Sequence, residues 1–184
     1  MKRFAVLTSA VALMISGLSA SAAELQSGLQ PGDSPGAFNV QDVTGPSKGK
    51  SLCYRCQYGN RPVISIFARD VDENLTALIK KVDDAVAENQ DSQLKAFVVL
   101  LTDDPDAAEQ KLAKVAADNK IKHVPLTFFD GVQGPEGYQI SSGADVSVMM
   151  WVQSDVKASH ALPKGKLDKT AVKSILADTS KILN

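Results

Sequence analysis

Runs of apolar, β-branched residues mark the strands of this chain. Pro62–Arg69 and Ala96–Thr102 are almost continuously apolar and have the length of strands that are buried on both faces. A shorter apolar run covers Val124–Phe129, and an opening run covers positions 38–43 and ends at Gly45. These runs predict strands of one sheet.

Between and after these strands the hydrophobic period changes to that of a helix. The apolar stripe of the first helix is Leu75, Leu78, Ile79, Val82 and Val86. Asp70, followed three residues later by Glu73, predicts a capping box at its start, and the helix extends to about Glu88. Asp104 is a favoured N-cap residue and stands before Pro105, which fits the first helical position. A second helix is therefore expected after the second long strand.

The last part of the chain predicts a hairpin and a helix. Val146–Val152 and Val156–Leu162 are strand-like runs that flank a turn at Ser154-Asp155. Asp168 then predicts the N-cap of a last helix. The apolar stripe of that helix is Val172, Ile175, Leu176 and Leu183. Parallel strand–helix–strand units followed by an antiparallel hairpin and a helix predict an α/β sandwich around one mixed sheet.

The beginning of the chain has the pattern of a secretory signal peptide. Lys2 and Arg3 precede the apolar run Phe4–Leu18, and the small residues Ala20–Ala22 fit a cleavage site. We therefore expect residues 1–22 to be removed and the protein to be exported, either to a periplasm or to the outside of the cell.

Segment 23–36 is rich in Gly and Pro and is expected to be a flexible leader, so that one folded domain occupies 37–184.

Composition and charge narrow the classes of partner that the protein can bind. Charged residues make up 22% of the chain, and loss of the signal peptide takes the formal net charge from −1 to −3. The sequence has no basic stretch that favours nucleic acid or an anionic membrane, and no later apolar run long enough to span a bilayer. No motif indicates a cofactor.

The candidate chemistry lies in the motif Cys53-Tyr54-Arg55-Cys56. Two cysteines at this spacing can form a redox dithiol, and an adjacent arginine favours the thiolate by its charge. In an exported protein the pair is expected to oxidise to a disulfide. Because the motif precedes the first long strand, it should lie at the amino end of the sheet. Two further interpretations stay open: a structural disulfide that closes the loop 45–60, and thiols that are reduced or joined to a partner.

The order of these segments resembles the thioredoxin-like superfamily. Pro35–Gly45 is similar to the opening strand of its peroxiredoxin-like and TlpA-like members, and Val63–Ala68, Phe97–Thr102 and Asp145–Lys157 follow in the family's order. The resemblance implies a three-layer sandwich in which a mixed central sheet is flanked by helices. It also implies thiol–disulfide chemistry with a protein or peptide partner.

The chain departs from that family at both of its hallmark sites. The family's reactive cysteine follows the first core strand, where this chain reads Arg69–Glu73, and the position of a thiol peroxidase's nucleophile holds Val71 or Asp72. The family's cis-proline precedes the closing hairpin, where this chain reads Gly143–Val146. Pro125 resembles that proline by its neighbours, but the order of elements places it one strand too early.

Two functions of different classes follow. In the first, the protein is a thiol–disulfide oxidoreductase in which Cys53 attacks, Cys56 resolves and Arg55 lowers the pKa of the thiolate, an assignment that the family resemblance implies. In the second, it is a non-catalytic thioredoxin-fold module that binds a partner, and the disulfide is structural. No metal site is expected, because His123 and His160 stand in no motif with the two cysteines. The oligomeric state is left open.

Overall fold

The structure is a computed structural model of the chain and describes residues 25–183. The predicted signal peptide, residues 1–22, lies outside this range. The elements in chain order are β1 (Val40–Asp42), β2 (Ser51–Leu52), α1 (Tyr54–Tyr58), β3 (Val63–Ala68), α2 (Glu73–Glu88), β4 (Lys95–Thr102), α3 (Pro105–Asn119), β5 (Leu126–Asp130), β6 (Val146–Val152), β7 (Asp155–Leu162), α4 (Lys169–Ala177) and α5 (Ser180–Leu183).

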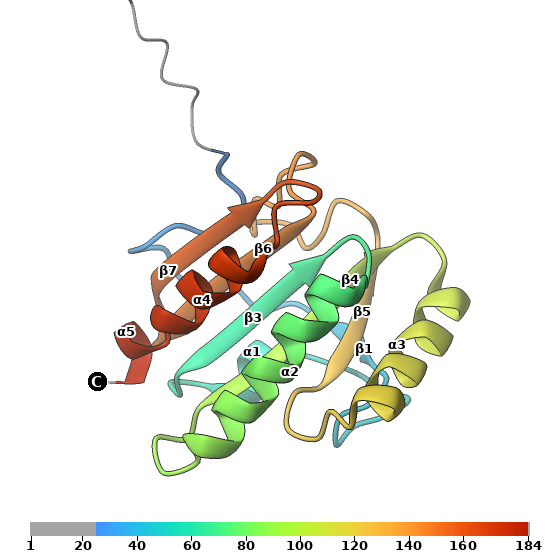
Figure 1. Cartoon of the computed structure of the whole chain (residues 1–184), viewed down its shortest axis with the longest axis horizontal. Coiled ribbons are helices and arrows are strands. Elements are labelled where there is room, and N and C mark those ends of the chain that lie inside the picture. Colours follow the sequence, from blue (N-terminus) through green and yellow to red (C-terminus); the bar gives the residue numbers. More distant parts are fainter. Residues whose placement is uncertain (1–24, 184) are drawn as a thin grey trace, which may run out of the picture.

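One mixed sheet organises the fold, as the sequence predicted (Figure 1). Its strand order is β2-β1-β5-β4-β3-β6-β7, in which β3, β4 and β5 are parallel and the remaining neighbours are antiparallel. The chain steps from β3 to β4 to β5 in one direction across the sheet. Because such crossovers are right-handed, α2 and α3 must cover the same face. Figure 1 shows them there, with α4 beside α2.

The two faces of the sheet carry different layers. The face under α2, α3 and α4 holds the aliphatic core, to which Leu78, Leu112 and Ile175 contribute from the three helices. The opposite face holds an aromatic core that includes Phe97 and Trp151. That face is covered by α1, by the segment before β1 and by the loop 131–145. The fold is therefore a three-layer sandwich in which one outer layer is mostly irregular.

The segment before β1, for which the sequence predicted a flexible leader, is extended, and its described part is packed against the sheet. Leu29 is buried, and its backbone N–H donates to Sδ of Met149 at 3.2 Å. Asp33 and Val156 of β7 are joined by a backbone hydrogen bond of 3.0 Å. Gly28 has a φ of 84°, and a Cβ there would lie 2.9 Å from the Met149 sulfur. Residues 27–35 therefore contribute to the core at the β7 edge of the sheet.

The start of α2 differs from the predicted capping box. The N-cap is Asp72, whose carboxylate accepts from the backbone N–H of Leu75 at 2.7 Å, and the helix begins at Glu73. Asp70 instead forms an ion pair with Lys111 of α3. The prediction was wrong because both aspartates are favourable cap residues, and the cap falls where the chain turns after leaving β3.

Candidate functional site

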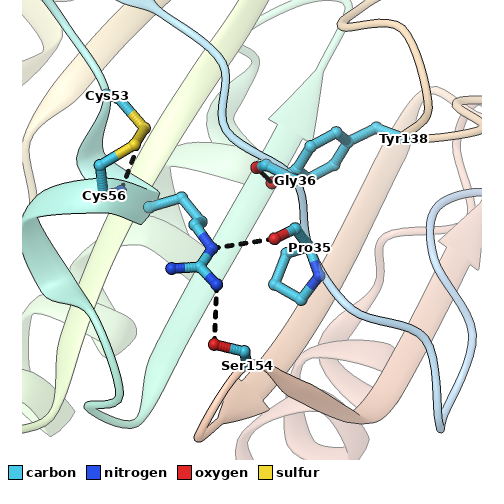
Figure 2. The surroundings of a disulfide bond; sticks show 7 residues. Pro35, Gly36, Cys53, Cys56, Tyr138 and Ser154 are labelled. Atoms are coloured by element: carbon cyan, nitrogen blue, oxygen red, sulfur yellow. Dashed lines mark hydrogen bonds between the residues drawn. A yellow bond between two sulfur atoms is a disulfide. The ribbon is translucent and has the colours of Figure 1, made fainter.

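The two cysteines form a disulfide at the start of α1 (Figure 2). Their Cα atoms are 5.2 Å apart, and Cys53 is the N-cap residue of this five-residue helix. The backbone N–H of Cys56 donates to the Sγ atom of Cys53 at 3.0 Å. Cys53 is half-buried and Cys56 is exposed. The sulfur of Cys53 thus accepts a hydrogen bond, while Cys56 is the residue that solvent and a partner can reach.

The disulfide lies at the start of α1, on the aromatic face of the sheet, and the C-terminal end of α1 leads toward the amino end of the parallel strands. α1 leads within a few residues into Val63, the first residue of β3. The turn between β6 and β7 lies at the same end, where the backbone N–H of Gln153 donates to the carbonyl of Asn60 at 3.0 Å. Arg69, which directly follows β3, lies at the opposite end. Leu52, directly before Cys53, is aligned through β1 and β5 with the carboxyl half of β4, so the chain before β3 folds back over the sheet. That the cysteine pair and the family's usual site occupy opposite ends of the sheet therefore stays a prediction.

Tyr54 fastens α1 to the sheet. Its side chain is 1% exposed, its ring stacks on Phe97 with centroids 5.7 Å apart, and its hydroxyl donates to the Asp42 carboxylate at 2.8 Å. The same carboxylate accepts from the backbone N–H of Gly45 at 2.7 Å. Burial, then the hydrogen bond to Asp42 and its negative charge, raise the pKa of Tyr54 far above its ordinary value. The disulfide therefore rests on an anchored helix.

Tyr58, one turn further along α1, makes a second attachment to the same face. Its ring centroid lies 5.2 Å from that of Tyr54, and its hydroxyl donates to the carbonyl of Ala96 in β4 at 3.3 Å. Burial raises the pKa of Tyr58 as well. Both tyrosines thus hold α1 as neutral phenols.

Arg55 turns away from the sulfur atoms. Its Nε donates to the carbonyl of Pro35 at 2.8 Å and its Nη2 donates to Oγ of Ser154 at 2.7 Å. These two acceptors, labelled in Figure 2, belong to the leader and to the β6–β7 turn. The donor in contact with Cys53 is instead the N–H of Cys56, a group that the sequence analysis had not singled out. Spacing alone could have suggested it, because an N-cap side chain commonly accepts from the N3 amide.

The position after β3 is occupied by an arginine clamp. Arg69 donates from Nε to the carbonyl of Ala144 at 2.9 Å, from Nη1 to that of Val132 at 2.6 Å and from Nη2 to that of Ser141 at 3.1 Å. All three acceptors belong to the loop 131–145, which connects β5 to β6. Where the thioredoxin-like family places a reactive thiol, this chain has a residue that fixes a loop.

Pro125 precedes β5, as the order of elements predicted. Its carbonyl accepts from the backbone N–H of Val98 in β4 at 3.0 Å, so it belongs to the parallel part of the sheet. The residues before β6 are Gly143–Asp145, and no peptide bond between residues 25 and 183 is cis. The family's proline site therefore has no counterpart in the described part of this chain.

Among residues 25–183, neither histidine forms a hydrogen bond with the two cysteines. His160 shares a hydrogen bond of 3.0 Å with Asp178 through Nε2, and His123 is exposed. Within residues 25–183 no three side chains of His, Cys, Asp or Glu gather as a metal site would need. No helix in this range combines the length and the apolar character that crossing a bilayer requires.

Comparison with known proteins identifies the fold. No protein-family model and no curated protein matches the sequence. Among solved structures, a putative thiol:disulfide interchange protein DsbE from Chlorobium tepidum superposes with a TM-score of 0.60 at 15% identity, over 82% of this chain and 99% of the other. The peroxidoxin BcpB from Mycobacterium tuberculosis gives 0.57 at 18% identity, over 84% and 98%. An uncharacterized conserved protein from Geobacillus kaustophilus gives 0.62 at 10% identity, over 83% and 82%.

These likenesses show the fold. The chain has the thioredoxin-like α/β sandwich that the sequence predicted, with a mixed central sheet flanked by helices. It carries its Cys-x-x-Cys disulfide before the first parallel strand and an arginine after it.

Proposed function

We propose that the protein is an exported thiol–disulfide oxidoreductase that works through Cys53 and Cys56. The observation that carries the proposal is the contrast between the two residues: Cys56 is exposed, and the sulfur of Cys53 accepts an N–H donor. A hydrogen bond to the charged form stabilises a thiolate. Cys53 is therefore the better leaving group when a partner thiolate attacks the bond.

The structure favours an order of attack that differs from the one the family resemblance implied. A partner thiolate reaches the sulfur of Cys56 more easily than that of Cys53, because Cys56 is the exposed residue. Attack there forms a mixed disulfide with Cys56 and leaves the bonding electron pair on Cys53. In the reverse reaction Cys53, held as a thiolate, displaces the partner from Cys56.

Arg55 has two roles in this proposal. Its hydrogen bonds to Pro35 and Ser154 keep α1 in place, and its positive charge, directly before Cys56 and two residues after Cys53, favours a thiolate on the helix. The protein partner is expected to present a thiol or disulfide. The name of the Chlorobium tepidum neighbour, a putative thiol:disulfide interchange protein, supports this activity, and the signal-peptide pattern of residues 1–22 supports export.

The reduction potential of the Cys53–Cys56 pair tests the proposal. Thiol trapping across a glutathione and then a dithiothreitol redox series should give a value between about −120 and −270 mV, the span of catalytic dithiols. In the Cys53→Ser variant, Cys56 should accumulate a mixed disulfide with a thiol partner, and the variant with both cysteines replaced by serine provides the blank.

A second candidate function is a partner-binding module with a structural disulfide, which the arginine clamp at the family's nucleophile position favours. A potential below about −300 mV, with no mixed disulfide on Cys56, would establish this second function and reject the first. Replacing both cysteines would then lower the melting temperature and leave partner binding intact.

A further inference from the structure

A polar cavity opens beside the helix that carries the disulfide. Its volume is about 660 Å³, within the range of small-ligand sites. It lies at the amino end of the sheet, between α1, the end of α2 and the beginnings of β4 and β5. Its lining consists of Gln57, Tyr58, Arg61, Val86, Gln90, Gln93, Leu94, Lys95 and His123.

The charged groups of this cavity are cationic. Arg61 and Lys95 line it together with the ring of His123, and none of the lining residues is acidic. Within residues 25–183 the Lys95 ammonium and the His123 ring have no hydrogen-bond or ion-pair partner, and Arg61 makes one contact, from Nη1 to the carbonyl of Gln57 at 3.1 Å. In a chain whose formal net charge is −1, this is a local site for an anion.

The buried acidic side chain behind this cavity is already compensated by backbone donors. Asp83 of α2 is buried behind the segment that carries His123, and its Oδ1 accepts from the backbone N–H of His123 at 2.6 Å and of Val124 at 2.9 Å. Lys122 donates to it in the same way at 3.1 Å. Its charge is thus directed at backbone donors, and the side chains of Arg61 and Lys95 remain available to a ligand.

The cavity is within reach of the disulfide. Gln57 and Tyr58 line it and directly follow Cys56 in α1, and consecutive Cα atoms are about 3.8 Å apart. A ligand bound in the cavity therefore lies against the same short helix that carries Cys56. Tyr58 holds this side of the cavity in place, because its hydroxyl donates a hydrogen bond to the carbonyl of Ala96.

We infer that the thiol that exchanges with Cys53–Cys56 carries carboxylates close to its sulfur, and that Arg61, Lys95 and His123 bind them. The inference rests on the proposed oxidoreductase function. A free small thiol with carboxylates and a cysteine in an acidic peptide segment share this chemistry.

The exchange balances without a further reagent. The partner thiolate attacks the Cys56 sulfur, the Cys53–Cys56 bond breaks, and the electron pair passes to Cys53. A second partner thiolate then attacks the partner's sulfur in the mixed disulfide and releases Cys56. Two partner thiols become one disulfide, and the protein gains two electrons and two protons as two thiols.

Rates of reduction of the oxidised protein test the inference. The probes are glutathione, its diethyl ester and cysteamine, and each rate is corrected for the fraction of thiolate. Glutathione should react about tenfold faster than its ester at low ionic strength, an advantage that salt should reduce. The double variant Arg61→Gln/Lys95→Gln should lose most of this advantage. The control Lys166→Gln/Lys173→Gln removes the same charge from exposed positions away from α1 and should keep it.

The outcomes separate the inference from the proposed function. Equal rates for glutathione and its ester, or an advantage that survives in the Arg61→Gln/Lys95→Gln variant, would overturn the anionic-thiol inference while the oxidoreductase function stands. Failure of every probe to form a mixed disulfide with Cys56 would reject the function itself. A cysteine peptide flanked by glutamates, compared with one flanked by glutamines, shows whether the acidic-peptide source is used. Circular dichroism and melting temperatures establish that each variant is folded.

Discussion

Asp42 is a buried carboxylate that accepts a hydrogen bond from α1, the helix that carries the disulfide. It is 1% exposed and accepts from the Tyr54 hydroxyl at 2.8 Å. In the Tyr54→Phe variant the carboxylate keeps its backbone donors at Gly45 and Ser47 but loses this one. Since a hydrogen bond to a buried charge contributes more than one to a neutral group, we expect the free energy of unfolding to fall by about 2–3 kcal/mol. Urea denaturation measures it.

Tyr138→Phe is the matched control at the residue scale. Tyr138 is equally buried, and its hydroxyl donates at 2.8 Å to the neutral carbonyl of Gly36. Its replacement should cost only about 1 kcal/mol. A loss in Tyr54→Phe no larger than in this control would mean that the Asp42 charge does not stabilise α1.

The clamp at Arg69 connects one residue to an entire loop and gives a prediction at the scale of elements. Arg69→Lys keeps the positive charge but cannot reach three carbonyls, because only the guanidinium has a planar fork of donors. We expect faster hydrogen exchange across 131–145 and a loss of about 1–3 kcal/mol in the free energy of unfolding. Hydrogen exchange followed by mass spectrometry measures the first effect.

The control for the clamp is Lys111→Gln at the same end of the sheet. It removes the exposed ion pair with Asp70, which should contribute at most about 1 kcal/mol, and it should leave exchange in the loop unchanged. If Arg69→Lys and the wild type exchange equally in 131–145, other contacts hold that loop.

Elements that are long enough to show a hydrophobic period could be predicted from the sequence, and shorter elements could not. β3, β4 and the β6–β7 hairpin lie where their apolar runs placed them, and Asp104 and Asp168 cap α3 and α4 as expected. Segment 45–60, predicted as a loop, contains β2 and α1. A two-residue strand and a five-residue helix are too short to show a period, and α1 is stabilised by distant partners.

The disulfide of the candidate site could be predicted from the sequence, and the residues that surround it could not. The spacing of Cys53 and Cys56 indicated the bond between them. The anion cavity brings Arg61 next to Lys95 and His123, which are far apart in the sequence and meet only once the parallel strands align. Arg55 was the charge visible in the motif, but tertiary contacts direct it to Pro35 and Ser154.

At the scale of the whole molecule, the aromatic face of the sheet predicts how the protein unfolds in alkali. The chain has three tyrosines, and burial raises the pKa of Tyr54, Tyr58 and Tyr138 above the ordinary value of 10.0. The folded state therefore retains phenol protons that the unfolded state releases. This contribution to stability is fully present below about pH 10 and decreases as the pH rises toward the folded pKa values, by roughly 1 kcal/mol per pH unit for each tyrosine.

Tyrosinate absorbance and far-ultraviolet circular dichroism, recorded on the same alkaline titration, should consequently change together, because each phenol ionises when the aromatic face is exposed. Tyr138→Phe removes one of the three groups and should make the loss of stability with pH less steep. Tyrosinate that forms near pH 10 while the circular dichroism stays native would show that solvent reaches these phenols in the folded protein. The layer formed by α1, the leader and the loop 131–145 would then not seal the aromatic face, and the support of the disulfide would be looser than its contacts indicate.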